Sequence, residues 1–105
     1  MAYDEALADR IRALVRAEQS VTEKKMFGGL AFLVGGNMAV AASGQGGLLV
    51  RVDPDESDQL VRTTAAETMV MRGRPMRGWL RVDAGDDVAD WVARGVGYAR
   101  SLPPK

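Results

Sequence analysis

The chain has 105 residues, of which 47% are hydrophobic and 27% are charged, so we expect a single domain with an ordinary core. Its 14 basic residues balance its 14 acidic ones, and the whole molecule therefore has no net attraction for nucleic acid or anionic membranes. The absence of cysteine excludes disulfides and thiolate sites, and the absence of histidine removes the commonest general base near neutral pH.

We expect a cytoplasmic protein without a membrane segment. Asp4 and Glu5 stand where a signal peptide would carry positive charge. The apolar run at residues 30–34 is far shorter than the ~20 residues that a membrane helix needs.

Residues 4–18 are the first predicted element, an amphipathic helix that Asp4 can cap. Its apolar stripe, at helical spacing, consists of Leu7, Ile11, Leu14 and Val15.

Three strands joined by glycine-rich turns follow, at residues 30–34, 38–42 and 48–52. Gly35-Gly36-Asn37 predicts a hairpin, because glycine and asparagine tolerate a positive φ. The last of the three strands alternates, with Leu48, Val50 and Val52 on one apolar face.

A second helix begins after Asp53, with proline at its first position, and ends near Thr64. Two more strands, at 69–71 and 79–82, flank a turn predicted at Gly73–Gly78. Asp86-Asp87 should cap a final helix, which Pro103-Pro104 stops; its inward residues would be Val88, Trp91, Val92, Val96 and Leu102.

These elements predict an α+β two-layer sandwich: an antiparallel sheet of about five strands with three helices, in the order α-β-β-β-α-β-β-α. We expect one core to include Phe27, Phe32, Val50, Trp79 and Trp91. Two interpretations stay open for Gly95 and Gly97 in the last helix: close approach of another backbone, or tolerance of a weak helix end.

The sequence contains few residues suited to catalysis, and we predict no catalytic, cofactor or metal site. The frame Gly73 to Gly78 matches the glycines of a phosphate-binding P-loop, but Trp79 and Leu80 replace its lysine and hydroxyl residue. The acidic residues after Asp53 fit a capped helix start better than a calcium loop, which would need glycine where Asp58 stands.

The strongest local charge is a basic segment without an acid between residues 69 and 82. Arginine forks suit phosphate or carboxylate recognition, so the candidate anion-binding or partner-binding residues are Arg72, Arg74, Arg77 and Arg81, joined by Lys24 and Lys25 if the strands align. The alternative, which we favour, is a solvated turn paired with nearby acids.

The order of several short motifs resembles the N-terminal domain of the TfoX/Sxy family of competence regulators. The resemblance covers nearly the whole chain and is carried by Met26-Phe27-Gly28-Gly29, Gly36-Asn37-Met38, Leu49-Val50-Arg51-Val52, Gly73-Arg74-Pro75-Met76-Arg77-Gly78-Trp79 and Tyr98-Ala99-Arg100-Ser101-Leu102. It implies a fold similar to secretion chaperones. It also implies a regulatory role, since the founding members act in competence as coactivators alongside the cyclic-AMP receptor protein.

We therefore expect residues 1–105 to form one TfoX N-terminal-like domain, without the C-terminal helical domain of the founding members. The expected function is non-enzymatic and regulatory, through a protein partner. The alternatives are weak DNA binding through residues 72–81, which the balanced charge does not favour, and an enzyme or small-ligand binder. Near-zero net charge also suggests a homodimer.

Overall fold

Three helices and six strands follow one another in the order α-β-β-β-β-α-β-β-α in the computed structural model, which describes residues 3–18, 20–26, 28–44, 46–83 and 87–104. The helices are α1 (Glu5–Val15), α2 (Pro54–Thr63) and α3 (Val88–Ser101). The strands are β1 (Val21–Met26), β2 (Gly29–Val34), β3 (Asn37–Ala42), β4 (Leu48–Arg51), β5 (Glu67–Met71) and β6 (Arg74–Val82). All neighbouring strands are antiparallel, in the spatial order β1-β2-β3-β4-β6-β5.

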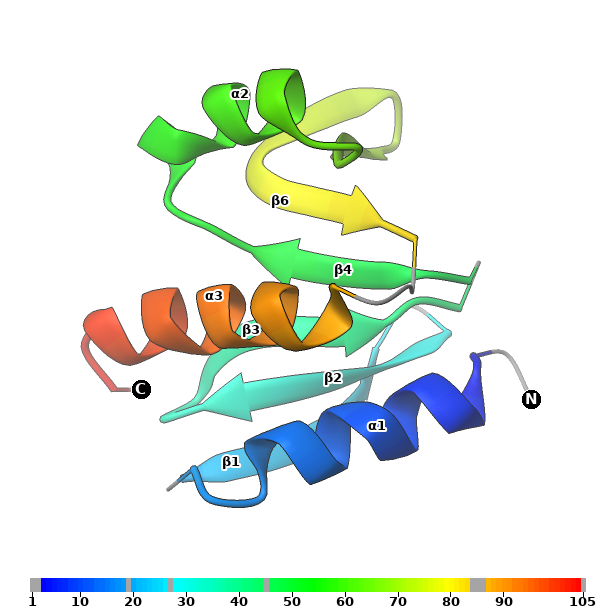
Figure 1. Cartoon of the computed structure of the whole chain (residues 1–105), viewed down its shortest axis with the longest axis vertical. Helices are drawn as coiled ribbons and strands as arrows, with labels where there is room; N and C mark the ends of the chain where they lie inside the picture. The colour runs from blue at the N-terminus through cyan, green and yellow to red at the C-terminus, as the bar shows by residue number, and fades with distance from the viewer. Residues whose placement is uncertain (1–2, 19, 27, 45, 84–86, 105) are drawn as a thin grey trace.

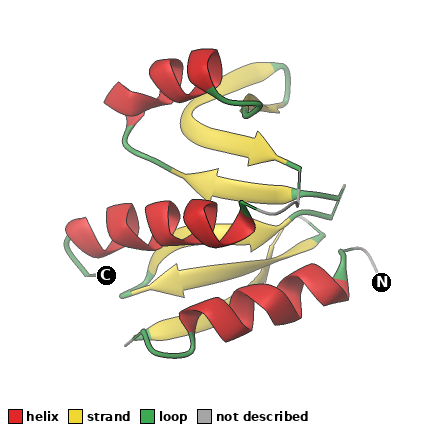
Figure 2. Cartoon of the chain, in the orientation of Figure 1, coloured by secondary structure: helices red, strands yellow, loops and turns green. Residues whose placement is uncertain are grey.

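The sheet and the helices form the two layers that the sequence predicts, so the α+β class is confirmed. Figure 1 shows α1 and α3 lying across the front of the sheet and α2 at its upper end, beside the curved strand β6. The same layering appears by element type in Figure 2. None of the helices in the described ranges is long and apolar enough to cross a membrane.

The prediction of about five strands missed β1. Its sequence, Val-Thr-Glu-Lys-Lys-Met, has no apolar alternation, and its four central residues are exposed. An edge strand can form without a buried face, because backbone hydrogen bonds to its one neighbouring strand hold it in place. Here β2 pairs with β1 along its full length.

The helix starts follow the predicted capping, with one exception. The Asp4 carboxylate accepts hydrogen bonds from the amides of Ala6 and Leu7, and the Asp53 carboxylate accepts one from the Asp55 amide. Asp87 makes no side-chain cap; its Oδ2 accepts instead from the Trp91 indole at 3.1 Å. The Asp86 part of that predicted cap lies outside the described residues.

Two hairpin turns illustrate a correct and an incorrect prediction. Gly35 and Gly36 join β2 to β3 with φ of 59° and 84°, as expected for a tight two-residue turn. The turn between β5 and β6, however, is Arg72-Gly73, with φ of 53° and 77°, rather than the predicted Gly73–Gly78. The stretch after Gly73 instead belongs to β6.

A bend in β6 explains this difference. Gly78 has a φ of 90°, its carbonyl accepts from the Val52 amide at 2.8 Å, and its own amide donates to the buried Ser57 Oγ at 3.2 Å. These bonds hold the bend against α2 and the end of β4. The strand bends at Gly78 but continues beyond it. The glycine and proline residues that predicted a turn therefore belong to a bent strand.

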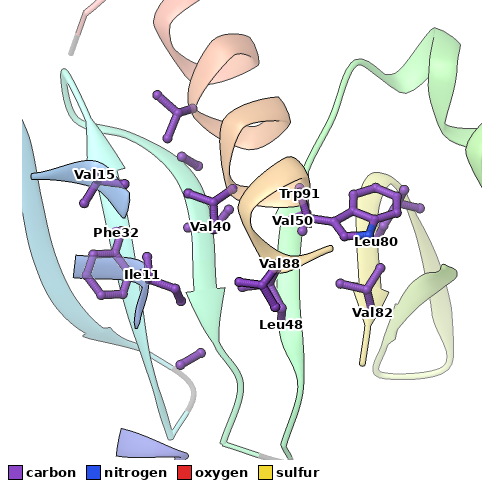
Figure 3. Packing of buried hydrophobic residues seen from close by; sticks show 14 of the residues in the cluster. Ile11, Val15, Phe32, Val40, Leu48, Val50, Leu80, Val82, Val88 and Trp91 are labelled. Atoms are coloured by element: carbon purple, nitrogen blue, oxygen red, sulfur yellow. The ribbon is translucent and has the colours of Figure 1, made fainter. Parts of the chain in front are cut away.

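The main core lies between the sheet and the helix layer (Figure 3). Phe32, Val50 and Trp91 belong to it, as predicted, whereas Phe27 lies outside the described residues. The prediction for Trp79 is wrong, because its side chain is only partly buried and lies on the other face of the sheet. Leu14, expected in the stripe of α1, is 39% exposed.

The two glycines of α3 differ in their surroundings. A Cβ on Gly95 would lie 2.5 Å from the Ala39 carbonyl oxygen, whereas one on Gly97 would meet nothing within 4 Å. Close approach to the sheet therefore explains Gly95 but not Gly97.

Candidate interaction surface

One face of the sheet has no helix packed on it within the part of the chain that the structure describes. Side chains alternate across each strand, so Leu49 of β4 and Trp79 of β6 point away from the core that Val50 and Leu80 enter. We call this side the open face; its apolar side chains are Met26, Ala31, Leu33, Met38, Ala41, Leu49, Met69, Met76 and Trp79.

The open face is hollowed into a trough. Two adjoining hollows of about 450 and 460 Å³ share four lining residues, Met26, Met38, Leu49 and Met69. Met26 belongs to β1 and Met69 to β5, which are the opposite edges of the sheet. Since both edges line the same space, the sheet curls around the open face, and the trough runs between its two edge strands.

Two alanines and a leucine are the most buried side chains of this surface. Ala31, Ala41 and Leu49 are buried, while the four methionines and Trp79 around them are only partly buried. Methionine is flexible and polarisable, and it adapts to differently shaped apolar partners. The trough therefore offers an apolar floor with adaptable walls.

Arginine and lysine side chains line the same trough. We call Lys24, Arg51, Arg72 and Arg81 the basic rim. Glu67 is the one acid among the described residues that line the two hollows, so these residues have a formal net charge of +3, although the whole chain is neutral.

Two rim cations are held by contacts within the chain. The Arg51 guanidinium lies 5.3 Å from the centre of the Trp79 ring and 5.7 Å from that of Tyr98, both within cation–π range. The Arg81 guanidinium donates to the Gly46 carbonyl at 2.8 Å. These contacts orient both charges before any ligand arrives.

Acidic side chains concentrate on the opposite layer. The helices and their N-caps carry nine of the 14 acidic residues: Asp4, Glu5, Asp9, Asp53, Asp55, Glu56, Asp58, Asp87 and Asp90. The same helices and caps also carry six arginines, which are Arg10, Arg12, Arg16, Arg62, Arg94 and Arg100. Their formal net charge is therefore −3, opposite in sign to that of the trough lining.

An ion pair on the helix side joins α1 to β1. The Arg12 guanidinium donates two hydrogen bonds to the Glu23 carboxylate, at 2.8 and 2.9 Å. These bonds lower the pKa of Glu23 from its ordinary value of 4.5 and raise the pKa of Arg12. Glu23 pairs in register with the core residue Phe32, so it faces the helices and takes no part in the trough.

The six basic residues singled out in the sequence do not form one patch. Lys24, Arg72 and Arg81 line the trough, and Arg74 shares the face of Met76 by alternation along β6. Arg77 points to the helix side and pairs with Asp55 at 3.7 Å.

Lys25 also falls on the helix side, because its register partner Leu30 belongs to the main core. The predicted alignment of the lysines with the arginines is therefore met by Lys24 alone.

Sequence reasoning missed Arg51 and the methionine walls of the trough. Arg51 follows Leu49 by two residues in a strand whose alternation had already been recognised, so its place opposite the core could have been inferred. The methionines carry no such signal, because each lies on a different strand and only the curl of the sheet brings them together.

Comparison with known proteins identifies the domain. A model of the TfoX N-terminal domain matches residues 13–98, a span that begins within α1, includes every strand and ends within α3. No curated protein and no solved structure matched the chain. Because the matched span exceeds four-fifths of the 105 residues, the chain belongs to the TfoX N-terminal domain family.

Proposed function

We propose that the chain is a regulatory interaction domain, similar to that of the competence regulators, and that it binds a protein partner on the open face of its sheet. Membership of the TfoX N-terminal domain family supports the regulatory setting. The observation that carries the proposal is the uncovered, methionine-lined trough.

Exposed and contiguous apolar surface marks binding sites in soluble domains. Here the partly buried side chains come from β1, β2, β3, β5 and β6 and converge on one concavity. The core on the other side of the sheet is complete without them, since it comprises a separate set of residues. The open-face side chains are thus available for a partner.

Direct DNA binding has less support. A duplex would be held chiefly by contacts between several cations and its phosphates. The basic rim supplies cations, but they share the trough with apolar side chains, and the neutral chain adds no overall attraction for a duplex. The proposal also assigns no catalysis to the chain.

Affinity capture from the native cell tests the proposal, with proteins identified by mass spectrometry. Met38→Glu and Met76→Glu place a carboxylate in the trough, and Leu14→Glu places one on an exposed apolar residue of the helix layer. We expect wild type and Leu14→Glu to retain the same protein and both methionine variants to lose it, with circular dichroism verifying that each is folded.

Equal retention by all four proteins would refute binding on the open face. Titration of a labelled duplex at low salt is the second measurement. Tight binding of duplex without any captured protein would replace the proposal with the DNA interpretation.

A further inference from the structure

We propose that the partner presents an acidic amphipathic α-helix to the trough. This inference rests on the function proposed above and adds to it the chemistry and secondary structure of the bound segment.

Charge complementarity indicates an acidic segment. The described lining of the trough carries a formal net charge of +3 in a neutral chain, and its cations line the same concavity as the apolar side chains. A complementary segment has an apolar stripe flanked by carboxylates. Such a stripe on a helix consists of apolar residues at i, i+3, i+4 and i+7, the pattern of helices that bind in apolar grooves.

Neither edge strand of the sheet is well suited to pairing with a strand from a partner. The exposed edge strand β1 carries Glu23, Lys24 and Lys25 in succession. The other edge, β5, has only five residues and an irregularity between Thr68 and Met69. Charges, short length and bulges are features that protect sheet edges from pairing with another chain, so the face is the more accessible surface.

The shape of the trough suits one helix. Met26 and Met69 reach it from opposite edges of the curled sheet. An α-helix is about 10–12 Å across with its side chains, and it presents a convex surface to this concavity. Ala31 and Ala41 leave depth at the centre of the floor for the larger side chains of a partner.

A second copy of this chain does not fit. A symmetric dimer would join the two open faces and bring basic rim against basic rim. The apolar residues of the most acidic helix, α2, are Leu60 and Val61, and both pack against the core, so α2 has no apolar stripe to offer another trough.

Designed peptides of ~18 residues, about five helical turns, test the inference with the full chain. One peptide has a leucine stripe flanked by glutamates, a second has lysines in place of the glutamates, and a third has the first composition with the stripe scrambled. Affinity is measured by fluorescence anisotropy, and helix formation by circular dichroism.

We expect the acidic striped peptide to bind at least about tenfold more tightly than the lysine peptide at low salt, with a smaller difference at high salt. It should gain helicity on binding. The double variant Lys24→Gln/Arg72→Gln should reduce this preference, whereas Arg77→Gln, which removes a cation on the helix side, should leave it unchanged.

Equal binding of the acidic and lysine peptides would overturn the acidic partner, and equal binding of the scrambled peptide would overturn the helix. If capture from the cell depends on Met38 and Met76 but the acidic peptide does not bind, this inference alone fails. If capture does not depend on them, the proposed function fails as well.

Discussion

Gly95 of α3 should be intolerant of any side chain, and alanine is the smallest test. A Cβ at this position would lie 2.5 Å from the Ala39 carbonyl oxygen and 2.8 Å from Val40 Cγ1. Ordinary contacts between non-bonded carbon atoms are about 3.5–4.0 Å, so α3 would have to move away from β3 by roughly 1 Å. The carbonyl belongs to a central strand and has little room to move.

The expected magnitude follows from two opposing terms. Overpacking a core costs about 1–3 kcal/mol, whereas replacing glycine by alanine within a helix stabilises it by about 1 kcal/mol. We therefore expect Gly95→Ala to lower the free energy of unfolding by up to about 2 kcal/mol. Gly97→Ala, where the added methyl meets nothing within 4 Å, should raise it by up to about 1 kcal/mol.

Guanidinium unfolding, followed by far-UV circular dichroism, measures both variants against wild type. The two substituted positions lie two residues apart on one helix, and both variants gain the same helix propensity. The difference between their free energies of unfolding therefore isolates the contact with the sheet. Equal stability of the two variants, or a Gly95→Ala protein at least as stable as wild type, would refute the packing argument.

Three further predictions concern the core, the open face and the α1–β1 ion pair. Trp91→Ala should cost about 3–5 kcal/mol, since Trp91 is 6% exposed; a loss below about 1 kcal/mol in chemical denaturation would contradict its place in the core. Trp79→Ala should cost much less, about 1 kcal/mol, and a loss as large as that of Trp91→Ala would mean that the open face is a second core. Glu23→Gln should slightly destabilise the protein at neutral pH, because it breaks the exposed pair with Arg12. The folded-state pKa of Glu23 is lowered, so its contribution is complete above the ordinary pKa of 4.5 and disappears as the pH falls through the lowered value; a difference from wild type that persists in acid would contradict this assignment.

Local signals account for the elements that the sequence determines by itself. The Gly35-Gly36 hairpin and the starts of α1 and α2 depend on residues within a few positions of one another. Their energetics are those of positive φ and of side-chain capping, which need no distant contact. The alternation of Leu48, Val50 and Val52 is also visible locally, although their burial depends on the helices that pack on the sheet.

Elements whose stability comes from distant partners were missed or misplaced. The charged strand β1 exists because β2 pairs with it, and β6 continues through Gly78 because Val52 and Ser57 hold its bend. Trp79 and Trp91 are equally apolar residues in the sequence. The pairing of β6 with β4 places Trp79 in the trough, whereas the packing of α3 on the sheet places Trp91 in the core.

The candidate site could be predicted only in part from the sequence, for the same reason. A run of arginines was visible, yet the turn between β5 and β6 places Arg72 at the trough. The irregularity of β6 near Gly78 then puts Arg81 on the trough side and Arg77, four residues earlier, on the side of α2. Composition and local patterning determined the α+β class and most of its elements. Only the curling of the sheet, a long-range property of six paired strands, decided that four methionines and four cations share one concave face.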